Sequence, residues 1–167
     1  MAKLQRIRQK VIDKDYYLSS HAEDEMRDDD LERSDVENAI LKGKIEKKLT
    51  EDLRGIRYRI EGPAHDGRLI HVVCRLKRRW TYYHNNSICI IGGYMDCEFC
   101  EGKTTKKKVT KDHWLHGKLY IVENVDVEVC LECGERYFHA KVLDNIDNLL
   151  GSEHEVKGIM DVEVVSL

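Results

Sequence analysis

Four cysteines are grouped in two CxxC pairs, Cys97/Cys100 and Cys130/Cys133, with 29 residues between the pairs. Thiolate sulfurs are common ligands of structural zinc, which takes four ligands in a tetrahedral arrangement, and one CxxC turn can supply two of them. The alternatives are iron in the same geometry and a redox-active CxxC, but two pairs without a βαβ context favour a metal. The pattern predicts one structural Zn²⁺ per chain, with no open position for catalysis.

A second group of chemically capable residues is cationic and aromatic and lies earlier in the chain. Alternation along two expected strands places four of them on one polar face: Arg57, Arg59, His71 and Arg75. The next segment interleaves cations with aromatic rings: Lys77, Arg78, Arg79, Trp80 and Tyr82. Because such cations bind phosphate and such rings stack on bases, this group predicts a surface for single-stranded RNA. The ordinary alternatives are solvated arginines on an open sheet face and a packed hairpin.

The elements that would position the cations follow from periodicity. Helical spacing predicts short helices at 18–26 and 34–43, the first with Ser19 or Ser20 as N-cap and the second with a capping box of Ser34 and Glu37. Alternation then predicts strands at 44–50, 56–62, 69–76, 78–84 and 87–93, the last two joined by a tight turn at 85–86. Helices followed by an antiparallel sheet make an α+β domain, with the helices on the apolar face of the sheet.

The elements expected around the cysteines are simpler. Residues 108–130 alternate as strands do, which would bring the second CxxC pair back beside the first, and 140–150 form an amphipathic helix pattern. Gly102 and Gly134 are expected to let the chain turn so that backbone N–H groups point at the sulfurs. The tail 158–167 has strand character, and its last part, 161–167, could extend either sheet. Three histidines are expected at the surface and two cysteines in the core: His113, His116 and His139, and Cys74 and Cys89.

Composition and charge limit the class of protein. The chain has 167 residues, of which 41% are hydrophobic and 35% charged, and it has one proline, as expected for a soluble globular protein without a long linker. It contains no apolar run of the roughly 20 residues that a membrane-spanning helix needs, and its N-terminus lacks a secretory pattern, so we expect a cytoplasmic protein. Residues 1–94 carry 19 Lys and Arg against 16 Asp and Glu, whereas 95–167 carry 9 against 15. A basic part joined to an acidic part can dock on it.

The first part resembles a known bacterial family. The order of the motifs "SSHAEDEM", "DVENAILKGKI", "GIRYRIEG", "GRLIHVVCRL" and "IIGGY", over about residues 15–94, is similar to that of the DUF 4258 family. The resemblance implies a RelE-like α+β toxin fold and an mRNA interferase activity. The family's usual threonine-x-tyrosine close is replaced here by "IIGGY".

An interferase of this kind would cleave RNA by attack of the 2′-hydroxyl on the adjacent phosphorus, without a metal. Histidine suits the two proton transfers because its pKa lies near neutrality, and arginine suits the charged phosphorane because its donors match phosphate geometry. The resemblance thus implies an acid/base pair, phosphate clamps and one auxiliary donor: His21 and His71; Arg57, Arg59 and Arg75; and Tyr94.

The second part resembles the YgiT-type zinc-finger family, which includes the N-terminal domain of the MqsA antitoxin. The matching stretches are "MDCEFCEGKTTKKKVT", "LYIVENVDVEVCLECGERYF" and the terminal "DVEVVSL". The resemblance implies an antitoxin with a structural zinc ion. No helix-turn-helix segment follows residue 150, so we expect no binding of DNA.

Together these features predict an α+β chain of two domains: 1–94, a RelE-like domain, and 95–167, a small zinc-ribbon-like β domain with one short helix. The expected function is that of a fused type II toxin–antitoxin protein, a metal-independent endoribonuclease acting on mRNA and restrained by its zinc domain. The restraint would act within the chain or between two chains of a homodimer. The alternative is a catalytically inactive RNA- or protein-binding regulator with a structural zinc ribbon.

Overall fold

The computed structural model describes residues 3–50, 55–76, 88–90, 96–163 and 165, without the side chains of 88–90. The elements follow in this order: α1 (Lys3–Ile12), β1 (Tyr17–Ser19), α2 (Ser20–Asp28), α3 (Arg33–Lys42), β2 (Lys44–Leu49), β3 (Arg57–Pro63), β4 (Leu69–Leu76), β5 (Ile88–Ile90), β6 (Thr104–Leu115), β7 (Lys118–Cys130), β8 (Arg136–His139) and α4 (Ala140–Leu150). No helix in the described part of the chain is long and apolar enough to cross a membrane.

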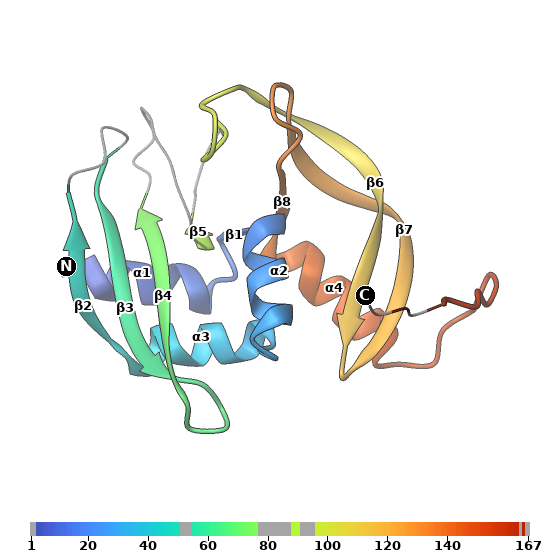
Figure 1. Cartoon of the computed structure of the whole chain (residues 1–167), viewed down its shortest axis with the longest axis horizontal. Coiled ribbons are helices and arrows are strands. Elements are labelled where there is room, and N and C mark those ends of the chain that lie inside the picture. Colours follow the sequence, from blue (N-terminus) through green and yellow to red (C-terminus); the bar gives the residue numbers. More distant parts are fainter. Residues whose placement is uncertain (1–2, 51–54, 77–87, 91–95, 164, 166–167) are drawn as a thin grey trace.

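The strands form two sheets, ordered β2-β3-β4-β5 and β1-β8-β7-β6 (Figure 1). The pairings are antiparallel except that of β4 with β5, which is parallel. The α+β class is confirmed, as are the strands expected near 44–50, 56–62 and 69–76 and the helix at 140–150. The expected strand at 78–84 and the turn at 85–86 lie outside the described residues.

The first sheet is covered on its apolar face by α3, as expected, and by α1, a helix that was not predicted from the sequence (Figure 1). Alternation in β3 and β4 buries Tyr58, Ile60, Val72 and Cys74 in this core. Burial raises the pKa of the Cys74 thiol to about 12, so this cysteine is a core thiol, as expected. The side chain of Cys89 lies outside the described residues.

One hydrophobic core connects the first and second parts of the chain. β1 pairs with β8, with Tyr17 opposite His139 and Ser19 opposite Tyr137. Leu18 packs in the same buried cluster as Phe138, and the cluster runs from α1 and α3 to β7 and α4. The division into 1–94 and 95–167 therefore remains a prediction about how the sequence is organised.

The structure confirms one of the expected helix caps and corrects the other. Ser19 is the N-cap of α2, and its hydroxyl accepts a hydrogen bond from the Ala22 N–H at 3.1 Å, as expected. The capping box of α3 is formed by Glu32 and Asp35, not by the expected Ser34 and Glu37, because the N-cap lies two residues earlier than expected. The prediction of strand structure in the tail is wrong for its described residues 158–163 and 165, which form no strand.

Candidate metal centre and the residues around it

The four cysteines of the two CxxC pairs come together at one end of the β6–β7 hairpin. Their sulfur atoms all lie within 4.8 Å of one another, with Cys97 3.5 Å from Cys133 and Cys100 3.3 Å from Cys130. Four sulfurs at about 2.3 Å from a tetrahedral zinc ion would be about 3.8 Å apart, so small shifts would accommodate one ion. The cluster could therefore hold a metal such as zinc.

Each pair is held in a turn of the same design. In the first turn the Cys97 N–H donates to the Gly102 carbonyl at 2.7 Å, and in the second the Cys130 N–H donates to the Glu135 carbonyl at 2.9 Å. We call residues 97–102 the first knuckle and 130–135 the second knuckle. In both, a backbone N–H also points at a sulfur: that of Phe99 at Cys97, at 3.3 Å, and that of Glu132 at Cys130, at 3.4 Å. These donors suit thiolate ligands.

The two knuckle glycines have different roles. Gly134 has φ +79°, the left-handed conformation that the turn requires. In the first knuckle that conformation falls on Glu101, with φ +67°, so the prediction that Gly102 provides the turn is wrong. Gly102 is needed for another reason, because a Cβ there would lie 2.5 Å from Cγ of Glu132.

The cysteines differ in their environments. Burial raises the pKa of Cys97. Burial also acts to raise the pKa of Cys130, but hydrogen bonds from the backbone N–H groups of Cys133 and Glu132 outweigh it and lower that pKa to about 7. Cys130 is thus readily deprotonated near neutrality, which is the form that binds a metal.

The first knuckle lies against two residues of the predicted RNA site. Glu98 Oε2 is 3.0 Å from Nη1 of Arg75, and the two side chains are 5% and 4% exposed. The ring of the neighbouring Phe99 meets the ring of His21 edge-on, with 5.7 Å between their centroids. The Glu98 N–H donates to the buried Tyr137 hydroxyl at 2.7 Å, which fixes the knuckle at this position. Arg75 was expected on an open face, and that expectation is wrong because Glu98 covers it.

The second knuckle lies against the start of α2. Glu135 Oε1 accepts a hydrogen bond from the Ser20 hydroxyl at 2.9 Å and from the His21 backbone N–H at 3.2 Å. Free N–H groups and the helix dipole make the N-terminus of a helix favourable for an anion. Each knuckle thus places one carboxylate on a group of the first part that attracts negative charge.

The other predicted site residues form a separate group. Arg59 is paired with Glu46, with Nη2 2.8 Å from Oε1, and His71 Nε2 lies 3.6 Å from a carboxylate oxygen of Glu46 and of Glu61. Tyr58 is opposite Cys74, so the register places Arg57 beside Arg75.

His71 is four residues from Arg75 along β4, about 13 Å away, so the predicted cations do not converge on one point. The remaining predicted residues lie outside the described residues: Lys77, Arg78, Arg79, Trp80, Tyr82 and Tyr94.

Sequence reasoning missed the residues that connect the two parts at this site: Glu98, Phe99, Glu135 and Tyr137. Their only signal was position, because the first two lie inside a CxxC pair and the others follow one closely. Nothing in the local pattern distinguishes a carboxylate that faces water from one that faces Arg75.

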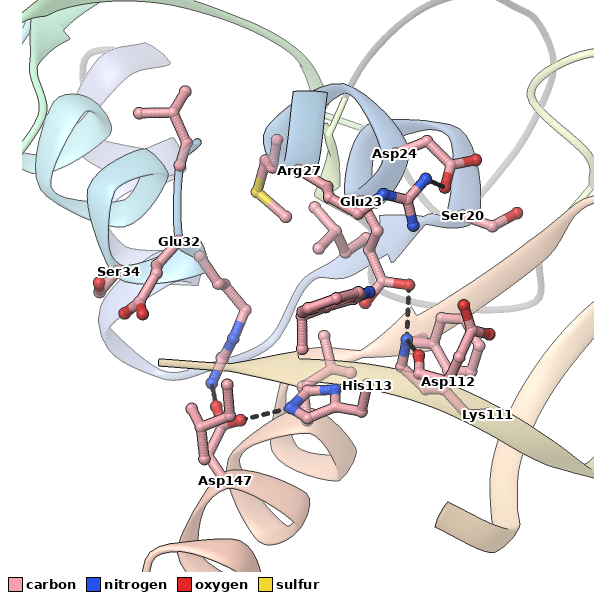
Figure 2. A pocket seen from close by; sticks show the side chains of 18 of the residues that line it. Ser20, Glu23, Asp24, Arg27, Glu32, Ser34, Lys111, Asp112, His113 and Asp147 are labelled. Atoms are coloured by element: carbon pink, nitrogen blue, oxygen red, sulfur yellow. Dashed lines mark hydrogen bonds and ion pairs between the residues drawn. The ribbon is translucent and has the colours of Figure 1, made fainter. Parts of the chain in front are cut away.

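A cavity of about 400 Å³ with a mixed polar and apolar lining lies between α2, α3, β6 and α4 (Figure 2). In Figure 2 Glu23 points across it to Lys111, with 2.9 Å between Oε2 and Nζ. The His113 ring donates a hydrogen bond from Nε2 to the Asp147 carboxylate at 2.7 Å. Burial raises the pKa of Glu23 even though Lys111 opposes that shift. His113 was expected at the surface, but it is 8% exposed because it packs between the two parts of the chain.

Comparison with known proteins supports the first resemblance in part. A family model described as "Domain of unknown function (DUF4258)" matches residues 18–82, from β1 through the end of β4 and beyond. No curated protein and no solved structure matches the chain. The matched range contains His21 and Arg75, and the four cysteines lie after it. The resemblances to RelE-like toxins and YgiT-type zinc fingers remain predictions.

Proposed function

We propose that the chain is a self-restrained endoribonuclease of the mRNA interferase type, in which a zinc-binding second part covers the RNA site of the first. The observation that carries the proposal is the buried ion pair of Arg75 with Glu98. A charged arginine is costly to bury without a partner, so a phosphate clamp that must be hidden needs a carboxylate brought from elsewhere. Glu98 comes from the metal-binding knuckle.

Two of the residues that the knuckles contact, Arg75 and His21, suit the chemistry of RNA cleavage. The His21 imidazole can exchange a proton with the 2′-hydroxyl or the leaving 5′-oxygen, and the Arg75 guanidinium can hold the charged phosphate during attack. Arg57 lies next to Arg75 and supplies a second cation. His71, farther along β4, is the candidate partner for a more distant part of the RNA strand.

A second candidate function is a regulator that binds RNA or protein without cleaving it. The observation that favours it is the ion pair of Arg59 with Glu46, together with the position of His71 3.6 Å from carboxylate oxygens of Glu46 and Glu61 on the same sheet. Contacts of this kind within one sheet stabilise its surface and leave these side chains less available to a substrate. The separation of about 13 Å between the His71 and Arg75 positions also favours a regulator that does not cleave RNA.

RNA cleavage by the full chain distinguishes the two functions. We expect little cleavage of single-stranded RNA by the zinc-loaded wild type and faster cleavage by Glu98→Gln, with 2′,3′-cyclic phosphate and 5′-hydroxyl ends. In the Glu98→Gln background, His21→Asn should abolish cleavage. His65→Asn is the matched control, because His65 is an exposed histidine. It lies on the turn after β3, and its Nδ1 is 3.1 Å from a carboxylate oxygen of Asp35.

The outcome that overturns the nuclease is equally definite. If Glu98→Gln and metal-stripped wild type both bind RNA but neither cleaves it, the regulator takes its place. If His65→Asn reduces cleavage as much as His21→Asn does, His21 has no catalytic role.

A further inference from the structure

The two knuckles each present one carboxylate to the first part of the chain. Glu98 faces the Arg75 guanidinium at 3.0 Å, and Glu135 faces the Ser20 hydroxyl and the His21 backbone N–H at 2.9 and 3.2 Å. The first contact is almost fully buried. The two contacts meet at His21, whose ring touches the first knuckle and whose backbone touches the second.

The groups that receive these carboxylates are those that bind phosphate in nucleic-acid sites. An arginine guanidinium presents N–H donors in a fork that fits a phosphate as well as a carboxylate. A hydroxyl and a backbone N–H at a helix N-terminus present donors and a positive partial charge to the same class of anion. A carboxylate oxygen and a phosphate oxygen are interchangeable acceptors in both places.

We propose that Glu98 and Glu135 occupy the places of two phosphate groups of single-stranded RNA, and that metal in the four-cysteine site keeps them there. The inference rests on the proposed function for the identity of the substrate. Displacement of the two carboxylates uncovers Arg75 and the start of α2 together. RNA binding is therefore controlled by metal occupancy.

The dependence on metal follows from where the two glutamates lie. Glu98 lies between two predicted ligands, Cys97 and Cys100, and Glu135 lies two residues after Cys133. Each sulfur of the first knuckle lies close to a sulfur of the second, Cys97 to Cys133 and Cys100 to Cys130. One ion bound by all four sulfurs would therefore cross-link the two turns. Without a bound ion, no ligand bond joins the two turns, and the knuckles can separate.

The test measures binding of an RNA that cannot be cleaved. A fluorescent single-stranded 2′-O-methyl oligonucleotide lacks the attacking hydroxyl, so its anisotropy reports binding to the full chain whether or not the protein is a nuclease. We expect zinc-loaded Glu98→Gln to bind at least tenfold tighter than zinc-loaded wild type. Its affinity should fall more steeply with salt, by about 0.7 in the slope of log K against log salt for each phosphate gained.

The matched control is Glu132→Gln, which removes an exposed carboxylate of the second knuckle and should change affinity less than twofold. Zinc content and circular dichroism verify that each variant is loaded and folded. If Glu98→Gln is folded and binds no tighter than Glu132→Gln, the inference is wrong.

A second arm uses the wild type alone, because loss of the buried Glu98 charge could prevent folding. Metal-stripped wild type should bind the oligonucleotide tighter than the zinc-loaded protein, and equal affinities would overturn control by the metal. Tight binding by Glu98→Gln without cleavage of unmodified RNA would leave this inference standing while removing the nuclease.

Discussion

Arg75 is a charged residue in the interior of the molecule, where an unpaired charge would be strongly unfavourable. Strand alternation predicted that Arg75 shares a solvated sheet face with Arg57 and Arg59. The structure does place the three residues on one face of the sheet. Its burial depends on Glu98, which is 23 residues away in sequence and belongs to another element. The chemical character of a residue follows from its own position in the sequence, but whether its charge faces water depends on residues far away in the chain.

His139 gives a pH-dependent prediction at the same scale. It is the N-cap of α4, and its Nδ1 accepts a hydrogen bond from the Lys141 N–H at 3.2 Å, which requires a neutral ring. Burial lowers the pKa of His139 below its ordinary 6.5, although Asp15 opposes the shift. The unfolded chain therefore takes up a proton that the folded chain excludes, and stability is lost as pH falls below about 6.5.

We expect His139→Asn to lose less stability than wild type between pH 7.5 and 5.5, because asparagine caps helices at either pH. The difference should be about 1 kcal/mol, the usual contribution of an N-cap. Urea denaturation of both zinc-loaded proteins at the two pH values measures it. Equal losses would show that the cap stays intact when His139 is protonated.

At the scale of elements, the knuckles are the part of the site that local sequence specified best. CxxC spacing sets the sulfurs in one turn, and the strand pattern of 108–130 returned the second pair to the first as expected. Only the role of Gly102 differed, since it makes room for Glu132. The α3, β3 and β4 segments were predictable for the same reason, because their periodicity is carried by neighbouring residues.

The metal assignment makes a direct prediction about these elements. We expect one zinc ion per wild-type chain and strongly weakened binding in Cys133→Ser, because the hydroxyl is a poor ligand and the remaining three thiolates leave the site incomplete. Zinc released on thiol modification can be counted with a colorimetric chelator. Cys74→Ser is the control, since Cys74 is buried in the core away from the knuckles and should retain full zinc content.

At the scale of the whole molecule, the two parts are joined by more than the chain between them. β1 adds to the sheet of β6, β7 and β8 (Figure 1). Leu18 shares a core with Phe138 and Leu143. The Glu23–Lys111 pair bridges α2 and β6 at the cavity of Figure 2. Loss of metal should therefore be felt in the first part as well as in the knuckles.

Hydrogen exchange tests that coupling. Removal of zinc from the full chain should raise exchange in β1 and α2, residues 17–28, because β1 pairs with β8 and the start of α2 is bonded to Glu135. The backbone of β2 should change little, since its partner is β3. Increases confined to residues 96–104 and 128–136 would contradict the coupling.

The sequence by itself determined the α+β class, most of the helices and strands that could be described, the core role of Cys74 and the four-cysteine cluster. These depend on spacings of two to four residues, which steric periodicity and turn geometry convert directly into structure. Only the tertiary structure decided that Arg75 is covered, that His113 is buried against Asp147, and that the described tail forms no strand. Each of these outcomes depends on which distant carboxylate or strand edge lies next to the residue. Such neighbours determine the free energy of burying a polar or charged group, and local sequence patterns do not specify them.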